Sequence, residues 1–499
     1  MFGLQDRVRH NRYRRKLDPK HRAHDTPFPG SQQGFVARAR RAPPGLPSNR
    51  WLHRYNPVAA IPPPETAIHR LLNRLAQVRP GEWPAVLWSF AYFFCLLCAY
   101  YVLRPVRDEM GIQAGIGNLP WLFTATFCAM LAAVPLFGWV SSRFPRRQFL
   151  PFIYLFFVAN LVLFFLLFSR KAALEVTTKA FFVWVSVFNL FVVSVFWSFM
   201  ADLYDTNQAR RLYGFIAAGG SLGAISGPAL TAVLASSLGP VNLLLVSAGF
   251  LVAGVYCIQR LGRWASSPAA GSALQTNARV GGGILDGIKL VARSRYLLGI
   301  CMYVVFYSTL STFLYFQQQQ IVKATIASSE QRTALFASLD LVVNFSTLAL
   351  QLLLFSRFLQ RYGLAAGLVL VPLLSVVGFF ALGLVPTLAV LIVFGVLRRM
   401  GEFTISKPAR ETLFNALSAD EKYKAKNFMD TAVYRAGDMA SGWMFTGLQQ
   451  AGIALTGISF VSVPLSVVWA GIGLWLARRH AAILAHPAEP TKRHAVQTV

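Results

Sequence analysis

The sequence has few charged residues for its length, and few of these are acidic. Only 14% of its 499 residues are charged, with 20 Asp and Glu against 48 Lys and Arg, whereas 55% are hydrophobic. A soluble protein of this size usually has about 25% charged residues. The composition therefore excludes an ordinary soluble enzyme and favours a chain that lies mostly in a lipid bilayer. The net charge of +28 falls largely in tails and alternate loops, so no nucleic-acid partner is expected.

Sequence patterns typical of catalytic and metal sites are also missing. There is no HExxH, no phosphate loop and no separate soluble stretch, so we expect no catalytic residues and no cofactor. The closest pair of cysteines, Cys95 and Cys98, has no second Cys/His pair to complete a metal site. All the cysteines fall in apolar segments, where they are expected to pack as inert thiols: Cys95, Cys98, Cys128, Cys257 and Cys301.

Long apolar runs dominate the rest of the chain. Most are close to the roughly 20 residues that a helix needs to cross a bilayer. They predict an all-α integral membrane protein with 12 transmembrane helices in two six-helix bundles. The predicted spans are 84–103, 119–140, 148–168, 179–200, 213–236, 240–258, 296–316, 332–355, 363–384, 387–406, 428–450 and 455–477.

Charge in the connecting segments predicts the topology. Lys and Arg are concentrated in the loops after the even-numbered spans, which the positive-inside rule assigns to the cytoplasm. Both termini are then cytoplasmic, and we expect a multi-pass protein of the plasma (inner) membrane. The predicted parts are a disordered basic tail without a secretory signal, an interfacial amphipathic helix, the first bundle, a cytoplasmic linker, the second bundle and a short tail: 1–64, 65–83, 84–258, 259–295, 296–477 and 478–499.

The two predicted bundles have similar loops. Ser142-Arg143-Phe144 follows the second span, and Ser356-Arg357-Phe358 follows the eighth. The stretch 138–147 resembles the loop 2–3 signature of the major facilitator superfamily, Gly-x-x-x-Asp-Arg-x-Gly-Arg-Arg, although Ser142 replaces its Asp. This resemblance implies two parallel six-helix repeats and alternating access between them, and a monomer is the usual state of that superfamily.

Charged residues at membrane depth are the strongest indication of function, because they are costly there and usually mark a polar path. At the end of the first span, Arg104 and Arg107 share a helical face if Pro105 does not break the helix. Two guanidiniums on one face would bind a phosphate or carboxylate. Asp108 belongs to the same candidate site. The alternative is an outer gate ion pair, Arg107 with Asp108 or Glu109 against another helix.

A glycine repeat follows the fourth span. Gly219, Gly223 and Gly227 recur every four residues and predict close helix packing. Just before this repeat, Asp202 with Arg210 or Arg211 is a candidate cytoplasmic gate pair; a solvated loop is the alternative.

The second predicted bundle also contains charged residues within apolar segments. Arg398 and Glu402 are four residues apart, so they are able to neutralise each other within one helix, which leaves Arg399 as an extra positive charge. Arg435, with Asp438 one turn on, is predicted to complete a basic site between the two halves. The full set of candidates for gating or coupling is Asp202, Arg210, Arg211, Asp340 in the eighth span, Glu402, Lys407, Asp430 and Asp438.

Three blocks of sequence resemble the ATP/ADP translocases of plastids and obligate intracellular bacteria. They are the stretch 103–108, the run around spans 4 and 5, and the passage 407–430. The resemblance implies nucleotide exchange and implicates Arg107 and Lys426 in substrate binding. Span 4 (Trp184–Asn189) and span 7 (Ser311–Tyr315) lack the glutamates of that family.

The sequence therefore predicts a secondary transporter of an anionic small molecule, with ATP and ADP as candidate cargo. One alternative is a proton-coupled organic-anion carrier in which Asp108, Asp340, Asp430 or Asp438 titrates. Another is a membrane sensor that binds a ligand without transporting it.

Overall fold

The computed structural model describes residues 78–79, 81–143, 146–265, 284–353 and 355–485. The predicted tail 1–64 and most of the predicted amphipathic helix 65–83 lie outside these residues. All regular structure in the described residues is helical. The helices are α2 (Trp83–Gln113), η1 (Ile116–Asn118), α3 (Leu119–Arg143), α4 (Arg146–Ser169), α5 (Leu174–Leu203), α6 (Thr206–Ala265), α7 (Ile284–Arg293), α8 (Arg295–Thr325), α9 (Ser329–Leu353), α10 (Phe355–Leu384), α11 (Leu388–Gly401), η3 (Glu402–Ser406), α12 (Lys407–Leu413), η4 (Phe414–Ala416), α13 (Ala419–Phe428), η5 (Met429–Val433), α14 (Tyr434–Gln450) and α15 (Leu455–Ala485).

Nine helices of the described residues are long and apolar enough to cross a membrane. The predicted spans fall largely on helical residues, so the prediction of an all-α membrane protein is confirmed, whereas the count of twelve stays a prediction. Two adjacent predicted spans share α6, whose backbone breaks at Gly239 (φ 77°) before Pro240. Large apolar side chains such as Phe152 (70% exposed) and Leu352 (72%) face outwards, as lipid-facing residues do.

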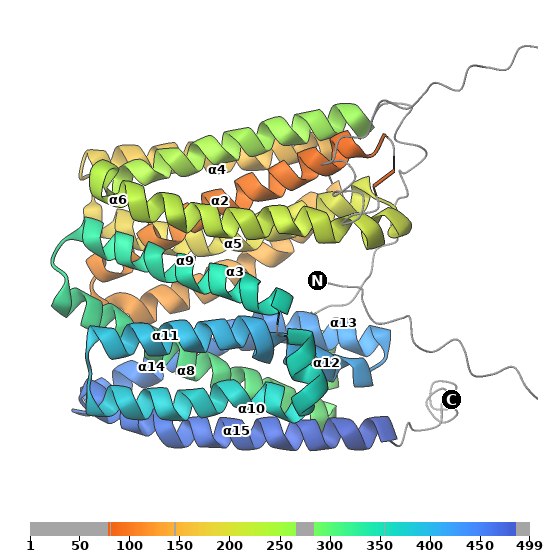
Figure 1. The fold of residues 1–499 in the computed structure, drawn as a ribbon. Helices are drawn as coiled ribbons and strands as arrows, with labels where there is room; N and C mark the ends of the chain where they lie inside the picture. The colour runs from red at the N-terminus through yellow and green to blue at the C-terminus, as the bar shows by residue number, and fades with distance from the viewer. Residues whose placement is uncertain (1–77, 80, 144–145, 266–283, 354, 486–499) are drawn as a thin grey trace, which may run out of the picture. The chain divides into compact units, whose positions relative to one another are not determined.

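The helices form two halves, which we define as 83–265 (first half) and 295–485 (second half). In Figure 1, α9 lies between helices of the first half and α11, and it packs against α2, α6 and α11. Charged side chains on α2, α9 and α11 are thereby brought to one region between the halves.

The glycine repeat packs α6 against α2. A Cβ at Gly219 would lie 2.4 Å from the carbonyl oxygen of Phe90, and one at Gly223 would lie 2.4 Å from that of Phe94. Only a residue without a side chain permits this approach, so the predicted packing role of the repeat is confirmed.

Two helices are longer than predicted. α6 continues to Ala265, and α15 continues to Ala485, well beyond the predicted end of each span. Two short π-helices interrupt the second half, at Glu402–Ser406 and Met429–Val433. π-Helical turns are rare in proteins as a whole, but they often occur at functional sites. Each of these two contains a predicted site residue, Glu402 in the first and Asp430 in the second.

Candidate substrate-binding site

The first predicted pair of arginines lies on an unbroken helix. α2 continues through Pro105 to Gln113, so Arg104 and Arg107 lie three residues apart on one face. Their side chains are 21% and 18% exposed, respectively. The two guanidiniums nevertheless have different partners.

Arg104 meets Arg399 of the second half at a shared carboxylate. Nη2 of Arg399 donates a hydrogen bond of 2.5 Å to Oδ1 of Asp340, and Nη1 of Arg104 lies 3.4 Å from the same oxygen. Asp340 is buried, and its other oxygen, Oδ2, has no hydrogen-bond partner in the described structure. We call Arg104, Asp340 and Arg399 the arginine–aspartate cluster. It joins α2, α9 and α11 and carries two positive charges against one negative charge.

Arg107 is held by its neighbour in the sequence. Its Nε and Nη2 donate to Oδ1 of Asp108 at 3.1 and 2.7 Å, and its guanidinium lies over the ring of Phe182. The hydroxyl of Tyr315, on α8, donates to the same Asp108 oxygen at 3.1 Å. Asp108 is therefore the counter-ion of Arg107 and a link between the halves.

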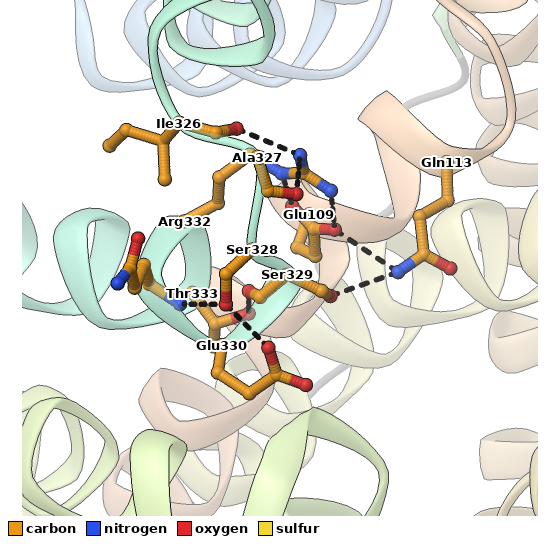
Figure 2. Close-up of polar contacts among 10 residues, drawn as sticks. Glu109, Gln113, Ile326, Ala327, Ser328, Ser329, Glu330, Arg332 and Thr333 are labelled. Atoms are coloured by element: carbon orange, nitrogen blue, oxygen red, sulfur yellow. Dashed lines mark hydrogen bonds and ion pairs between the residues drawn. The ribbon is translucent and has the colours of Figure 1, made fainter.

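A buried ion pair links α9 to α2 near the C-terminal end of α2 (Figure 2). Nε and Nη2 of Arg332, on α9, donate to the two carboxylate oxygens of Glu109, each at 2.7 Å. Nη1 donates to the carbonyls of Ile326 and Ala327, and Gln113 joins Glu109 to Ser329. Glu109 thus forms an ion pair with another helix, as in the alternative to substrate binding that the sequence left open. No spacing in the sequence singles out Arg332, although this residue begins a predicted span.

Arg398 and Glu402 do not form the within-helix pair that their spacing permits. Arg398 instead donates to Ser375, Ser311 and the carbonyl of Tyr307. Glu402 is buried, and its ion-pair partner is Arg410, at 3.4 Å. The physical reason is that Arg398 is held by α8 and α10, whereas a π-helical turn starts at Glu402 and leads directly into α12, which carries Arg410.

Arg435 and Asp438, one helical turn apart, form an ion pair. Nη1 of Arg435 lies 3.4 Å from Oδ2 of Asp438, and the hydroxyl of Ser308 donates to Oδ1 at 2.5 Å. Arg435 is thus attached to α8 through Asp438. Its predicted meeting with Arg104 and Arg107 stays a prediction.

The remaining candidates of the second half lie around α12 and α13. Nζ of Lys426 donates to Glu411 at 2.5 Å, with both side chains about one third exposed. Lys407 and Asp430 are exposed.

At the N-terminal end of α2, Arg211 and Gln208 donate to the carboxylate of Glu82. Burial alone would raise the pKa of Glu82, but hydrogen bonds from Arg211, the backbone N–H of Arg79 and Gln208 outweigh it and lower this pKa. Asp202 is half-buried nearby in the sequence, and its predicted gate pairing with Arg210 or Arg211 stays a prediction.

Several contacts join the two halves. Besides the arginine–aspartate cluster and the Glu109–Arg332 pair, the indole N–H of Trp443 donates to Thr124, and Asn344 donates to the carbonyl of Ala224. The cluster and the ion pair both use the C-terminal half of α2. No group of three or more His, Cys, Asp or Glu side chains suited to a metal occurs in the described part of the chain.

Comparison with known proteins agrees with this architecture. The model of the Major Facilitator Superfamily matches residues 89–421, so the chain belongs to this superfamily, and it is a multi-pass membrane transporter, not an enzyme.

The chain is also similar to two bacterial carriers. It is 21% identical to ADP,ATP carrier protein 2 of Chlamydia pneumoniae, over 85% of this chain and 95% of that one. It is 22% identical to ADP,ATP carrier protein 1 of Chlamydia muridarum (strain MoPn / Nigg), over 83% and 90%. The resemblance noted from the sequence is confirmed at this level.

Solved structures share the fold. The nucleoside transporter NupG superposes with a TM-score of 0.54 at 14% identity, covering 81% of this chain and 99% of that one. An auto-inhibited POT family peptide transporter gives 0.56 at 13%, covering 81% and 97%.

Proposed function

We propose that the chain is a secondary active transporter of an anionic solute, and that it works by alternating access with ATP and ADP as the first candidate cargo. The observation that carries this proposal is the excess positive charge of the arginine–aspartate cluster, where two guanidiniums from opposite halves share one carboxylate oxygen. A phosphate or carboxylate placed there would bring the missing negative charge and accept bidentate hydrogen bonds. Similarity to the chlamydial carriers supports a nucleotide cargo.

The Glu109–Arg332 pair supports the alternating part of this proposal. A bidentate, buried ion pair between the halves holds one end of the path closed, and it must break when that end opens. With the proposed cytoplasmic termini, this is the outer end, so we infer a state that is closed to the outside. We further propose a monomer in the plasma membrane, with the two predicted bundles as its domains.

Uptake of labelled ATP by cells that express the chain, with and without excess ADP, tests the cargo. The matched pair of variants is Arg104→Gln/Arg399→Gln and Arg170→Gln/Lys171→Gln, which remove equal charge from the cluster and from an exposed turn. We expect uptake that ADP suppresses, that the first double variant loses and that the second retains. Absence of uptake by inserted wild-type protein would reject nucleotides as cargo.

A further inference from the structure

We propose that Asp340 is a built-in competitor of the transported anion. It shares Arg104 and Arg399 with the substrate, weakens substrate binding and thereby permits release. This inference rests on the proposed function, because it concerns the affinity of the same site.

The geometry places Asp340 where a substrate oxyanion would bind. One oxygen, Oδ1, is within 2.5 Å of Arg399 and 3.4 Å of Arg104, so a single acceptor holds guanidiniums from both halves. Glu109, in contrast, uses both of its oxygens to hold Arg332. Oδ2 of Asp340 has no partner among the described residues.

The two arginines keep unused donors. Each guanidinium has five N–H groups. In the described contacts, Arg399 donates to Asp340, whereas Arg104 makes the 3.4 Å ion pair and lies over the ring of Tyr101. Both side chains are more than one fifth exposed, while that of Asp340 is 4% exposed. An anion approaching from the exposed side therefore finds free N–H groups on guanidiniums that Asp340 already partly neutralises.

A transporter must release its substrate as well as bind it, and Asp340 would assist release. A carried ion must bind strongly enough to enter a site and weakly enough to leave it. Two uncompensated guanidiniums would hold a phosphate too strongly for fast release, since hydrogen bonds between charged groups are the strong ones. A fixed carboxylate beside the substrate lowers the affinity without removing the donors that recognise the anion.

Asn344 helps to fix the competitor. It lies one turn after Asp340 on α9 and donates to the carbonyl of Ala224 at 2.7 Å, which attaches this part of α9 to α6. Asp340 thus stands on a helix that is held against the first half, opposite Arg399 on α11.

Purified full-length protein in lipid nanodiscs tests the inference by equilibrium binding of labelled ATP, together with maximal uptake rate in proteoliposomes. We expect Asp340→Asn to lower the Kd about tenfold or more, which corresponds to about 1.4 kcal/mol, and to lower the maximal rate. The matched control, Glu175→Gln, removes the same charge from an exposed pair with Lys179 and should change neither quantity.

An unchanged or higher Kd in Asp340→Asn, beside a wild type that binds ATP, would overturn the competitor role and leave the proposed function intact. A wild type that binds neither ATP, ADP nor inorganic phosphate would overturn both. If Asp340→Asn fails to fold, the comparison becomes Arg399→Gln against Arg399→Gln/Asp340→Asn. The second substitution should still lower the Kd, because Arg104 loses its competitor, and no decrease there would reject the inference.

Discussion

The guanidinium of Arg332 makes four hydrogen bonds, whereas that of Arg104 makes an ion pair at 3.4 Å and lies against a tyrosine ring. Both arginines meet a buried carboxylate of the opposite half. We call the pair Glu109–Arg332 saturated, because both carboxylate oxygens and all three guanidinium nitrogens are used, and four of the five guanidinium N–H groups donate. In the arginine–aspartate cluster, several guanidinium N–H groups have no acceptor among the described contacts, and two positive charges face one negative charge. We call this cluster unsaturated.

This difference separates two uses of charge in one membrane protein. A buried pair whose polar groups are nearly all satisfied stabilises one conformation and has little left to offer a ligand. A cluster with spare donors and excess positive charge is poorly stabilised by the protein alone and gains from an anion. The sequence shows only that both sites contain charged residues within apolar segments. How completely their hydrogen bonds are made distinguishes the proposed gate from the proposed binding site.

The largest expected effect comes from breaking the saturated pair. Glu109→Gln leaves Arg332 as an uncompensated buried charge, and loss of one partner of such a pair costs about 3–5 kcal/mol. We expect a marked fall in the thermal unfolding temperature of the purified protein. The double variant Glu109→Gln/Arg332→Gln should recover much of the loss, since it leaves no buried charge. A single variant as stable as the wild type would contradict the gate assignment.

Removing a charge from the unsaturated cluster should affect transport more than stability. Arg399→Gln removes a charge-assisted contact worth about 1.5–3 kcal/mol to a bound anion, so the KM for uptake should rise roughly tenfold to a hundredfold. The control Arg170→Gln removes an exposed positive charge and should leave the KM unchanged. Equal KM values in the two variants would contradict the site.

A smaller effect is expected from loosening the saturated pair without removing its charges. Gln113→Leu deletes the amide that joins Glu109 to Ser329, and we expect a loss of about 1 kcal/mol of stability, measured by thermal unfolding. The KM for uptake by this variant should equal that of the wild type, because the arginine–aspartate cluster is unchanged. A loss as large as that of Glu109→Gln would mean that the bidentate contact is not the main stabilising interaction.

The smallest effect is expected at Glu82, whose pair with Arg211 lies at the N-terminal end of α2. Its pKa is lowered in the folded protein, so its contribution is present above the ordinary carboxyl pKa and is lost as pH falls through the lowered value. Glu82→Gln should cost up to about 1 kcal/mol at pH 7. The difference in unfolding temperature from the wild type should shrink as the pH falls below about 4.

The elements of the fold were predictable because their cause is local. A run of about 20 apolar residues must pair its own backbone groups in lipid, so it forms a helix wherever it occurs. The glycine repeat likewise predicts its own packing, since only residues without side chains let two backbones approach so closely. The same local reasoning failed at Arg398 and Glu402, where the carboxylate at the start of a π-helix pairs with Arg410 of α12.

The sequence by itself determined that this protein is a helical membrane transporter with costly charges at membrane depth, because hydropathy and the free energy of burying a charge depend on residue type. Tertiary structure decided which charges meet. Glu109 and Arg332 are 223 residues apart, and Asp340 faces arginines of both halves, so no spacing predicts these contacts. Whether a charge is satisfied or still free to bind depends on these long-range distances, and only the packing of α2, α9 and α11 sets them.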